Sequence, residues 1–136
     1  FASYRSTMDS IKARNPRITI VHITAPLTDV QTGPKALIKR LLGRVPYGVL
    51  ENTRRQEYNS LLRQAYQGRE PIFDLAQIES TEPDGTASTT EWNGNRIPKL
   101  TAAYTDDGGH LNSIGRQRAA RELIKLLAMH TMHYAW

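Results

Sequence analysis

Apolar side chains recur every three or four residues in four stretches of the chain, which is the spacing of one face of an α-helix. The helices predicted from this pattern cover residues 1–13, 35–42, 51–67 and 113–129. The side chains expected to face the core from the last three helices are Leu37, Leu41, Leu42, Tyr58, Leu61, Leu62, Ala65, Tyr66, Ala120, Leu123, Ile124 and Leu127.

Two shorter stretches have the composition of strands. Residues 17–24 are rich in β-branched side chains and carry no acid, which suits a parallel strand covered on both faces. Residues 71–75 (PIFDL) form the second candidate strand, and predicted helices lie between the two. This order predicts an α/β fold with a parallel, right-handed βαβ unit. Because open sheets usually need more than two strands, we expect further strands in this sheet.

The segment between the second strand and the last helix is mostly polar. Residues 79–96 contain Asp84-Gly85 and Asn93-Gly94 and predict a long surface loop with a small hairpin. Trp92 in this loop either lines a substrate cleft or pins the loop to the body of the protein.

Length, charge and cysteine content narrow the class of protein. A chain of 136 residues fits one domain, and no apolar run is long enough for a transmembrane span. The net charge of +5 comes from scattered Lys and Arg on predicted helices, which favours solvated faces over nucleic-acid binding. The absence of Cys excludes disulfides and thiolate metal sites but fits either redox compartment, so the localisation stays open, export included.

The candidate chemistry lies in residues 104–112 (YTDDGGHLN), where Asp107 precedes His110 by three residues across two glycines. A neutral imidazole can take a proton from a hydroxyl, and a carboxylate behind it fixes the tautomer and stabilises the imidazolium. The spacing predicts that Asp107 accepts a hydrogen bond from His110 Nδ1 and that Nε2 faces an open cleft. The alternative is a glycine turn that caps the last helix, with His110 exposed. Under either interpretation, Asn112 is the predicted N-cap of that helix.

The Asp-x-x-His block, followed by Leu-Asn and a carboxy-terminal helix, resembles the last conserved block of the SGNH (GDSL-like) hydrolases. Residues 18–28 (ITIVHITAPLT) and 71–75 resemble that family's fourth and fifth strands. The resemblance implies a flavodoxin-like three-layer α/β/α fold with a parallel sheet, of which residues 1–136 are the carboxy-terminal part. It also implies an esterase acting on a small-molecule ester without a cofactor or metal, with Asp107 and His110 as catalytic residues.

Two motifs of that family do not occur in the chain. The Gly-Asp-Ser block that carries the nucleophilic serine is absent, and so is the Gly-x-Asn-Asp block that contributes to the oxyanion hole. We therefore expect both to precede Phe1, in an amino-terminal half of the same domain that this chain needs as its partner. Ser113 is nearest to His110, but it is expected to contact backbone N–H groups in the first turn of the last helix.

Other interpretations compete with the esterase. Without a recognisable nucleophile, the chain fits a non-catalytic binding or interaction domain derived from the same fold. A metal-dependent hydrolase would use Asp106, Asp107 and His110, although this ligand set is incomplete. Asp106 is also the second choice for the acid that orients His110.

Further histidines and acids have simpler interpretations. His22 is expected to be a core histidine and Asp74 a structural acid, although Asp74 remains a minor candidate for the site. His130 and His133 could share a metal from one helix face, but a frayed terminus is favoured because no third ligand is near in sequence.

Overall fold

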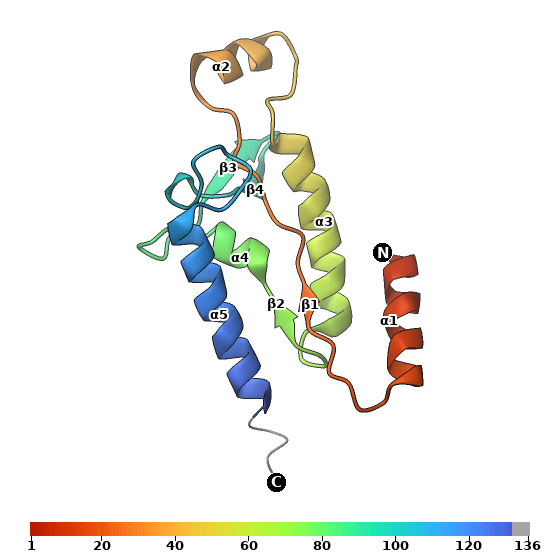
Figure 1. Cartoon of the computed structure of the whole chain (residues 1–136). Helices are drawn as coiled ribbons and strands as arrows, with labels where there is room; N and C mark the ends of the chain where they lie inside the picture. Colours follow the sequence, from red (N-terminus) through yellow and green to blue (C-terminus); the bar gives the residue numbers. More distant parts are fainter. Residues whose placement is uncertain (132–136) are drawn as a thin grey trace.

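The computed structural model describes residues 1–131 of the chain. A pair of parallel strands lies beside a long helix, an antiparallel hairpin packs near one end of that helix, and further helices surround these parts (Figure 1). The elements in chain order are α1 (Ala2–Arg14), β1 (His22–Ile23), α2 (Gly33–Leu41), α3 (Val49–Tyr66), β2 (Ile72–Phe73), α4 (Leu75–Glu79), β3 (Thr89–Trp92), β4 (Asn95–Pro98), a 3-10 turn η1 (Ala102–Tyr104) and α5 (Ser113–Thr131).

The parallel pairing of β1 and β2 confirms the predicted βαβ unit. His22 lies opposite Ile72, and Ile23 lies opposite Phe73. Both strands are much shorter than the predicted ranges, residues 17–24 and 71–75. Among residues 1–131, β2 is the only strand paired with β1, so most of the first range has no neighbouring backbone with which to form a ladder.

Past β1 the chain is held in place by side chains. On α3, Asn59 accepts a hydrogen bond from Ala25 N–H (2.7 Å) and donates to the carbonyl of the same residue (3.0 Å). Asn52 does the same with Thr28, at 3.0 Å and 2.7 Å. Both amides are buried, and each presents one donor and one acceptor, as a neighbouring strand would. The Asn52–Asn59 clamp therefore fixes the segment after β1 against α3.

The predicted hairpin is present as β3 and β4, joined at Asn93-Gly94. These two residues have φ values of +50° and +77°, as a tight two-residue hairpin turn requires. Trp92 packs against the buried cluster of Val30, Val49 and Ile97. The tryptophan therefore pins the hairpin to the body, which is the second of the two roles considered for it.

A second buried cluster connects the start of α5 to the rest of the chain. It consists of Leu27, Ala76, Leu100 and Tyr104, with Leu111 packed against it. Leu100 is fully buried in this cluster, which therefore joins the segment after β1 to α4, to η1 and to the loop before α5.

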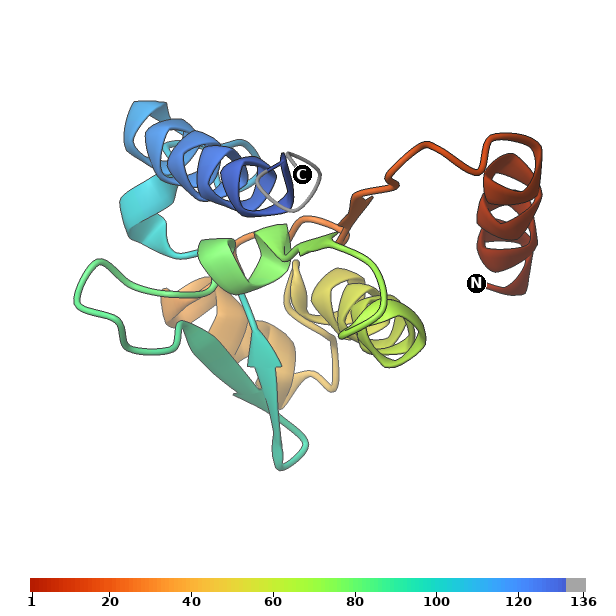
Figure 2. The same cartoon turned by 90° about the horizontal axis from the view of Figure 1, so that it is seen from below.

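The structure is mixed α/β, but residues 1–131 do not form the three-layer α/β/α arrangement with a broad parallel sheet. The two sheets contain two strands each, and α1 stands to one side of the body (Figure 2). The predicted inward faces of two helices are also wrong. On α2, Leu37, Leu41 and Leu42 are 60%, 79% and 66% exposed. Ala120, Ile124 and Leu127 are likewise exposed on α5.

Candidate functional site

The loop that carries the candidate residues is closed at its base by backbone pairing. Thr105 and Leu111 form an isolated antiparallel bridge, and Asn112 N–H donates to the Tyr104 carbonyl at 2.8 Å. Gly108 has a φ of +81°, a conformation that favours glycine. Asn112 Oδ1 accepts from Gly115 N–H at 3.0 Å, which confirms Asn112 as the N-cap of α5.

Within this loop Asp107 binds His110 through both backbone and ring. Oδ1 of Asp107 accepts hydrogen bonds from the N–H groups of Gly109 and His110, both at 2.8 Å. Oδ2 lies 2.7 Å from Nδ1 of His110, so the predicted hydrogen bond is confirmed. These backbone donors, together with the ring, hold the pKa of the Asp107 carboxyl well below its usual range. A charged carboxylate is thus kept against Nδ1, whereas Nε2 has no hydrogen-bond partner among residues 1–131.

The loop is anchored to the end of the segment that follows β1. The Gly108 carbonyl accepts from the Thr28 hydroxyl and from Asp29 N–H, both at 2.7 Å. Lys99 Nζ lies 3.0 Å from Asp29 Oδ1, so an ion pair also holds Asp29 in place. The anchor lies beyond the carboxyl end of β1, which is where parallel α/β sheets place their ligand sites.

Both side chains of the site are exposed to solvent. The His110 side chain is 89% exposed and that of Asp107 is 57% exposed. Across residues 1–131, no hydroxyl group is hydrogen-bonded to His110, and Ser113 is exposed. Asn112, and not Ser113, supplies the side-chain cap of α5.

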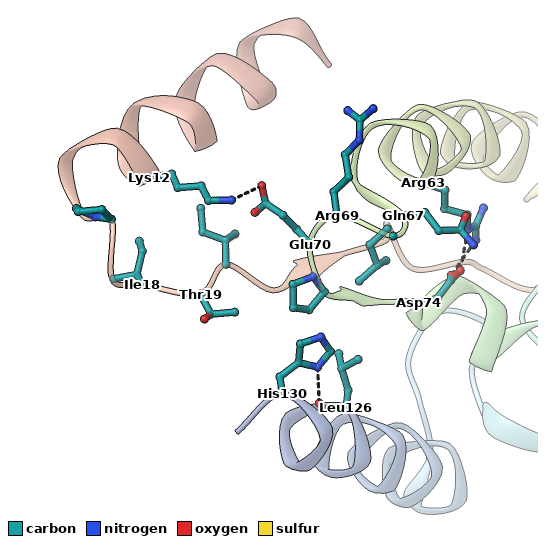
Figure 3. Close-up of a pocket in the computed structure, with 15 residues that line it drawn as sticks. Lys12, Ile18, Thr19, Arg63, Gln67, Arg69, Glu70, Asp74, Leu126 and His130 are labelled. Carbon is teal, nitrogen blue, oxygen red and sulfur yellow. Dashed lines mark hydrogen bonds and ion pairs between the residues drawn. The ribbon is translucent and has the colours of Figure 1, made fainter. Parts of the chain in front are cut away.

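A cavity of about 710 Å³ lies at the opposite end of the parallel strands, near the carboxy-terminal end of α5. Figure 3 shows Lys12, Glu70, Asp74 and His130 around it. His110 does not line this cavity, so the cavity is not the cleft expected beside Nε2.

The remaining candidates have structural partners. His22 is buried, stacks on Tyr66 with ring centroids 3.6 Å apart, and lies within hydrogen-bond distance of Tyr4 Oη (2.7 Å) and Glu70 (3.3 Å). It is therefore a core histidine, as expected. Asp74 pairs with Arg63 at 2.7 Å, and this guanidinium helps to hold the pKa of the Asp74 carboxyl below its usual range despite partial burial.

The metal interpretations find no matching cluster in the described part of the chain. No group of three His, Asp or Glu side chains is arranged to hold a metal ion there. Asp106 accepts a hydrogen bond from Asn112 Nδ2 at 3.2 Å, whereas Asp107 is engaged with His110. His130 Nδ1 lies 2.9 Å from the Leu126 carbonyl, and His133, its proposed co-ligand, lies outside the described residues.

Three buried polar residues hold the segment that anchors the site. None of them belongs to a motif recognised in the sequence. Glu79 accepts from Leu27 N–H at 2.6 Å, and burial raises the pKa of its carboxyl to about 7, against the opposing effect of that N–H group. Asn52 and Asn59 hold the same segment from α3. A signal for the asparagines does exist, because two polar residues about two turns apart fall on one face of the predicted helix.

Comparison of the chain with protein-family models, curated protein sequences and solved structures finds no match. Along residues 1–131, no helix has the length and apolar character needed to cross a membrane.

Proposed function

We propose that Asp107 and His110 are the acid and base of an SGNH-type serine esterase. The observation that carries this proposal is the 2.7 Å contact between Asp107 Oδ2 and His110 Nδ1, on a loop anchored beyond the carboxyl end of β1. The same carboxylate is fixed by two N–H groups, so it holds the ring in one orientation without help from a distant element. An oriented ring with a free Nε2 is what a general base for a hydroxyl nucleophile requires.

The nucleophile of this esterase comes from a segment outside the printed sequence. His110 Nε2 takes the proton of its serine as the serine oxygen bonds to the ester carbonyl carbon. The proton then passes to the departing alcohol, whose bond to the carbonyl carbon breaks, and water later releases the acid by the reverse proton route. Each oxyanion donor from that segment contributes about 3 kcal/mol to transition-state stabilisation.

The exposure of the pair supports such a second segment. Oxyanion stabilisation is strong in a site from which water is excluded, yet the His110 ring is almost fully open. Ile18 and Ile23 are 43% and 52% exposed along the β1 segment, whose outer edge lacks a strand partner within residues 1–131. We propose that further parallel strands pair there, which would complete a flavodoxin-like three-layer domain and bring the serine to His110.

The test uses the intact gene product that contains residues 1–136, assayed with a chromogenic ester. His110→Ala should lower kcat by about 10⁶-fold and Asp107→Asn by a smaller factor of about 10⁴. His130→Ala is the matched control, because this other histidine lies on α5 by the distant cavity. A serine-directed phosphonate should label the intact protein, but not residues 1–136 alone, whose rate should stay at the imidazole background. Unchanged turnover in both site variants would reject the proposal.

The competing proposal is a non-catalytic binding or interaction domain. The open Nε2 without a hydroxyl partner is the observation that favours it. A native upstream sequence without a Gly-Asp-Ser block, together with no phosphonate labelling of the intact protein, would decide for this alternative.

A further inference from the structure

The helix α2 stands apart from the body (Figure 1), and its large apolar side chains are exposed. Ala36 is its one buried residue, and Leu37, Ile38, Leu41 and Leu42 are each more than half exposed. At about 100° per residue, the centre of this leucine–isoleucine stripe lies nearly opposite Ala36. The small side chain therefore faces the protein, while the large apolar ones face away from it.

The sequence around this stripe is positively charged. The chain from Val30 to Leu50 contains no Asp or Glu, but it contains Lys35, Lys39, Arg40 and Arg44. Lys39 and Arg40 are tied down: Lys39 donates to Gln31 at 2.7 Å, and the Arg40 guanidinium lies 5.5 Å from the centroid of the Trp92 ring. Within residues 1–131, Lys35 and Arg44 have no acidic partner, so their charges are free to meet an external one.

The position of α2 is fixed by a narrow neck. Gln31 N–H donates to the Tyr47 carbonyl at 3.0 Å, which closes the excursion of residues 32–46 at its base. A Cβ at Gly48 would lie 2.3 Å from the Asp29 carbonyl oxygen, so the two sides of the neck touch. Asp29 N–H also holds the Gly108 carbonyl. A surface that receives α2 is therefore brought to the same end of the molecule as His110.

We propose that the outward face of α2 docks onto an anionic lipid surface, with the stripe inserted among the acyl chains and Lys35 and Arg44 at the phosphates. A short helix with an exposed apolar face, with Lys35 in its first turn and Arg44 just after its end, has the chemistry of an interfacial helix. A second copy of the chain fits less well, because two such faces would set their uncompensated positive charges against each other. The proposal rests on α2 alone and does not depend on the chemistry of His110.

The test measures co-sedimentation of the 136-residue chain with phosphatidylcholine vesicles, with or without phosphatidylglycerol. Binding should require phosphatidylglycerol and should weaken as salt increases. Leu41→Asp should weaken binding at least about tenfold, since it puts a charge into the apolar stripe. The double variant Lys35→Gln/Arg44→Gln should weaken it by about fivefold for each charge removed.

Matched control variants distinguish binding through this face of α2 from nonspecific binding of the chain to vesicles. Ile124→Asp changes a side chain that is 66% exposed on α5, and Arg121→Gln removes an exposed charge from the same helix. Both should bind like the unaltered chain, and thermal unfolding followed by circular dichroism should show that all variants fold. Equal binding to neutral vesicles, an equal loss in Ile124→Asp, or a dimer that Leu41→Asp dissociates in place of vesicle binding would each overturn the proposal.

Discussion

Asp107 uses its two carboxylate oxygens for different tasks. Oδ1 accepts the two backbone N–H groups that shape the turn, and Oδ2 accepts the His110 ring. The side chain therefore stays charged through the neutral pH range and favours a proton on Nδ1. The hydrogen bond that one ring nitrogen makes decides which of the two carries the proton, so the tautomer of His110 reports on its contact with Asp107.

The first prediction concerns this tautomer. In long-range ¹H–¹⁵N NMR spectra at a pH where the ring is neutral, His110 should be protonated at Nδ1. Asp107→Ala should populate both tautomers, because the carboxylate acceptor is lost. His22 is an internal control: its Nε2 faces Glu70 and its Nδ1 faces the Tyr4 hydroxyl, so it should keep the opposite tautomer in both proteins. A His110 protonated at Nε2 in the unaltered chain would contradict the prediction.

Glu79 is a buried acid that holds Leu27, the residue before the anchor of the site. Its carboxylate accepts Leu27 N–H, yet burial dominates and raises the pKa of its carboxyl to about 7 from an ordinary value of 4.5. The folded protein therefore holds a proton that the unfolded chain has already released between pH 4.5 and 7. Stability supplied by this protonation is present below the lower value and is lost as the pH rises through the upper one.

The second prediction concerns the loss of stability with rising pH that the raised pKa of Glu79 causes. The free energy of unfolding should fall from pH 5 to pH 8 by up to about 3 kcal/mol, at 1.4 kcal/mol for each unit of pKa difference. Glu79→Gln should remove this component, since it stays neutral and keeps a carbonyl oxygen for Leu27 N–H. Urea unfolding at several pH values measures both, with the exposed Glu57→Gln as control. The same slope in Glu79→Gln as in the unaltered chain would exclude Glu79 as its source.

At the scale of elements, the neck between α2 and α3 depends on one glycine. Gly48 has a φ of +87° and leaves no room for a side chain beside the Asp29 carbonyl. Gly43, at the other end of the same loop, has a φ of +67° but open space around it. The two glycines therefore share the left-handed backbone and differ in crowding, which allows the two effects to be separated.

The third prediction compares alanine at these two positions. Gly43→Ala should destabilise the chain by about 1 kcal/mol through the left-handed backbone alone. Gly48→Ala should cost about 3 kcal/mol or more, because a contact with backbone cannot be relieved by a rotamer change. Urea unfolding gives both values. Gly48→Ala should also shift the NMR signals of Gly108, through Asp29, and equal destabilisation by the two variants would contradict the crowding.

At the scale of the whole molecule, some predicted features depend on residues close in sequence and others on contacts between residues far apart in sequence. The helices, the Asn93-Gly94 turn and the contact of Asp107 with His110 depend on residues within a few positions of one another, and the sequence predicts them well. The predictions of the strand lengths and of the inward faces of α2 and α5 were wrong. These features depend on neighbouring elements that residues 1–131 do not supply. Short α4 was not predicted, since its N-cap Asp74 stood inside a predicted strand.

The candidate site divides in the same way. Its two chemical residues are visible as a motif, and the fixed carboxylate follows from the turn. The anchor of Gly108 on Thr28 and Asp29 joins positions far apart in the chain, so no local pattern predicts it. The roles proposed for Asp107 and His110 stay predictions until the esterase test is done.

The Asn52–Asn59 clamp requires that the spacing of two positions on α3 match the length of the segment beside it. The rise between the two asparagines is about 10.5 Å along a helix, and Ala25 to Thr28 spans about 10 Å of extended chain. The two lengths match only at this spacing. One residue inserted between the asparagines would turn one amide by about 100° away from its partner. Relatives of this chain should therefore vary in length at the hairpin but keep the interval between these two positions unchanged.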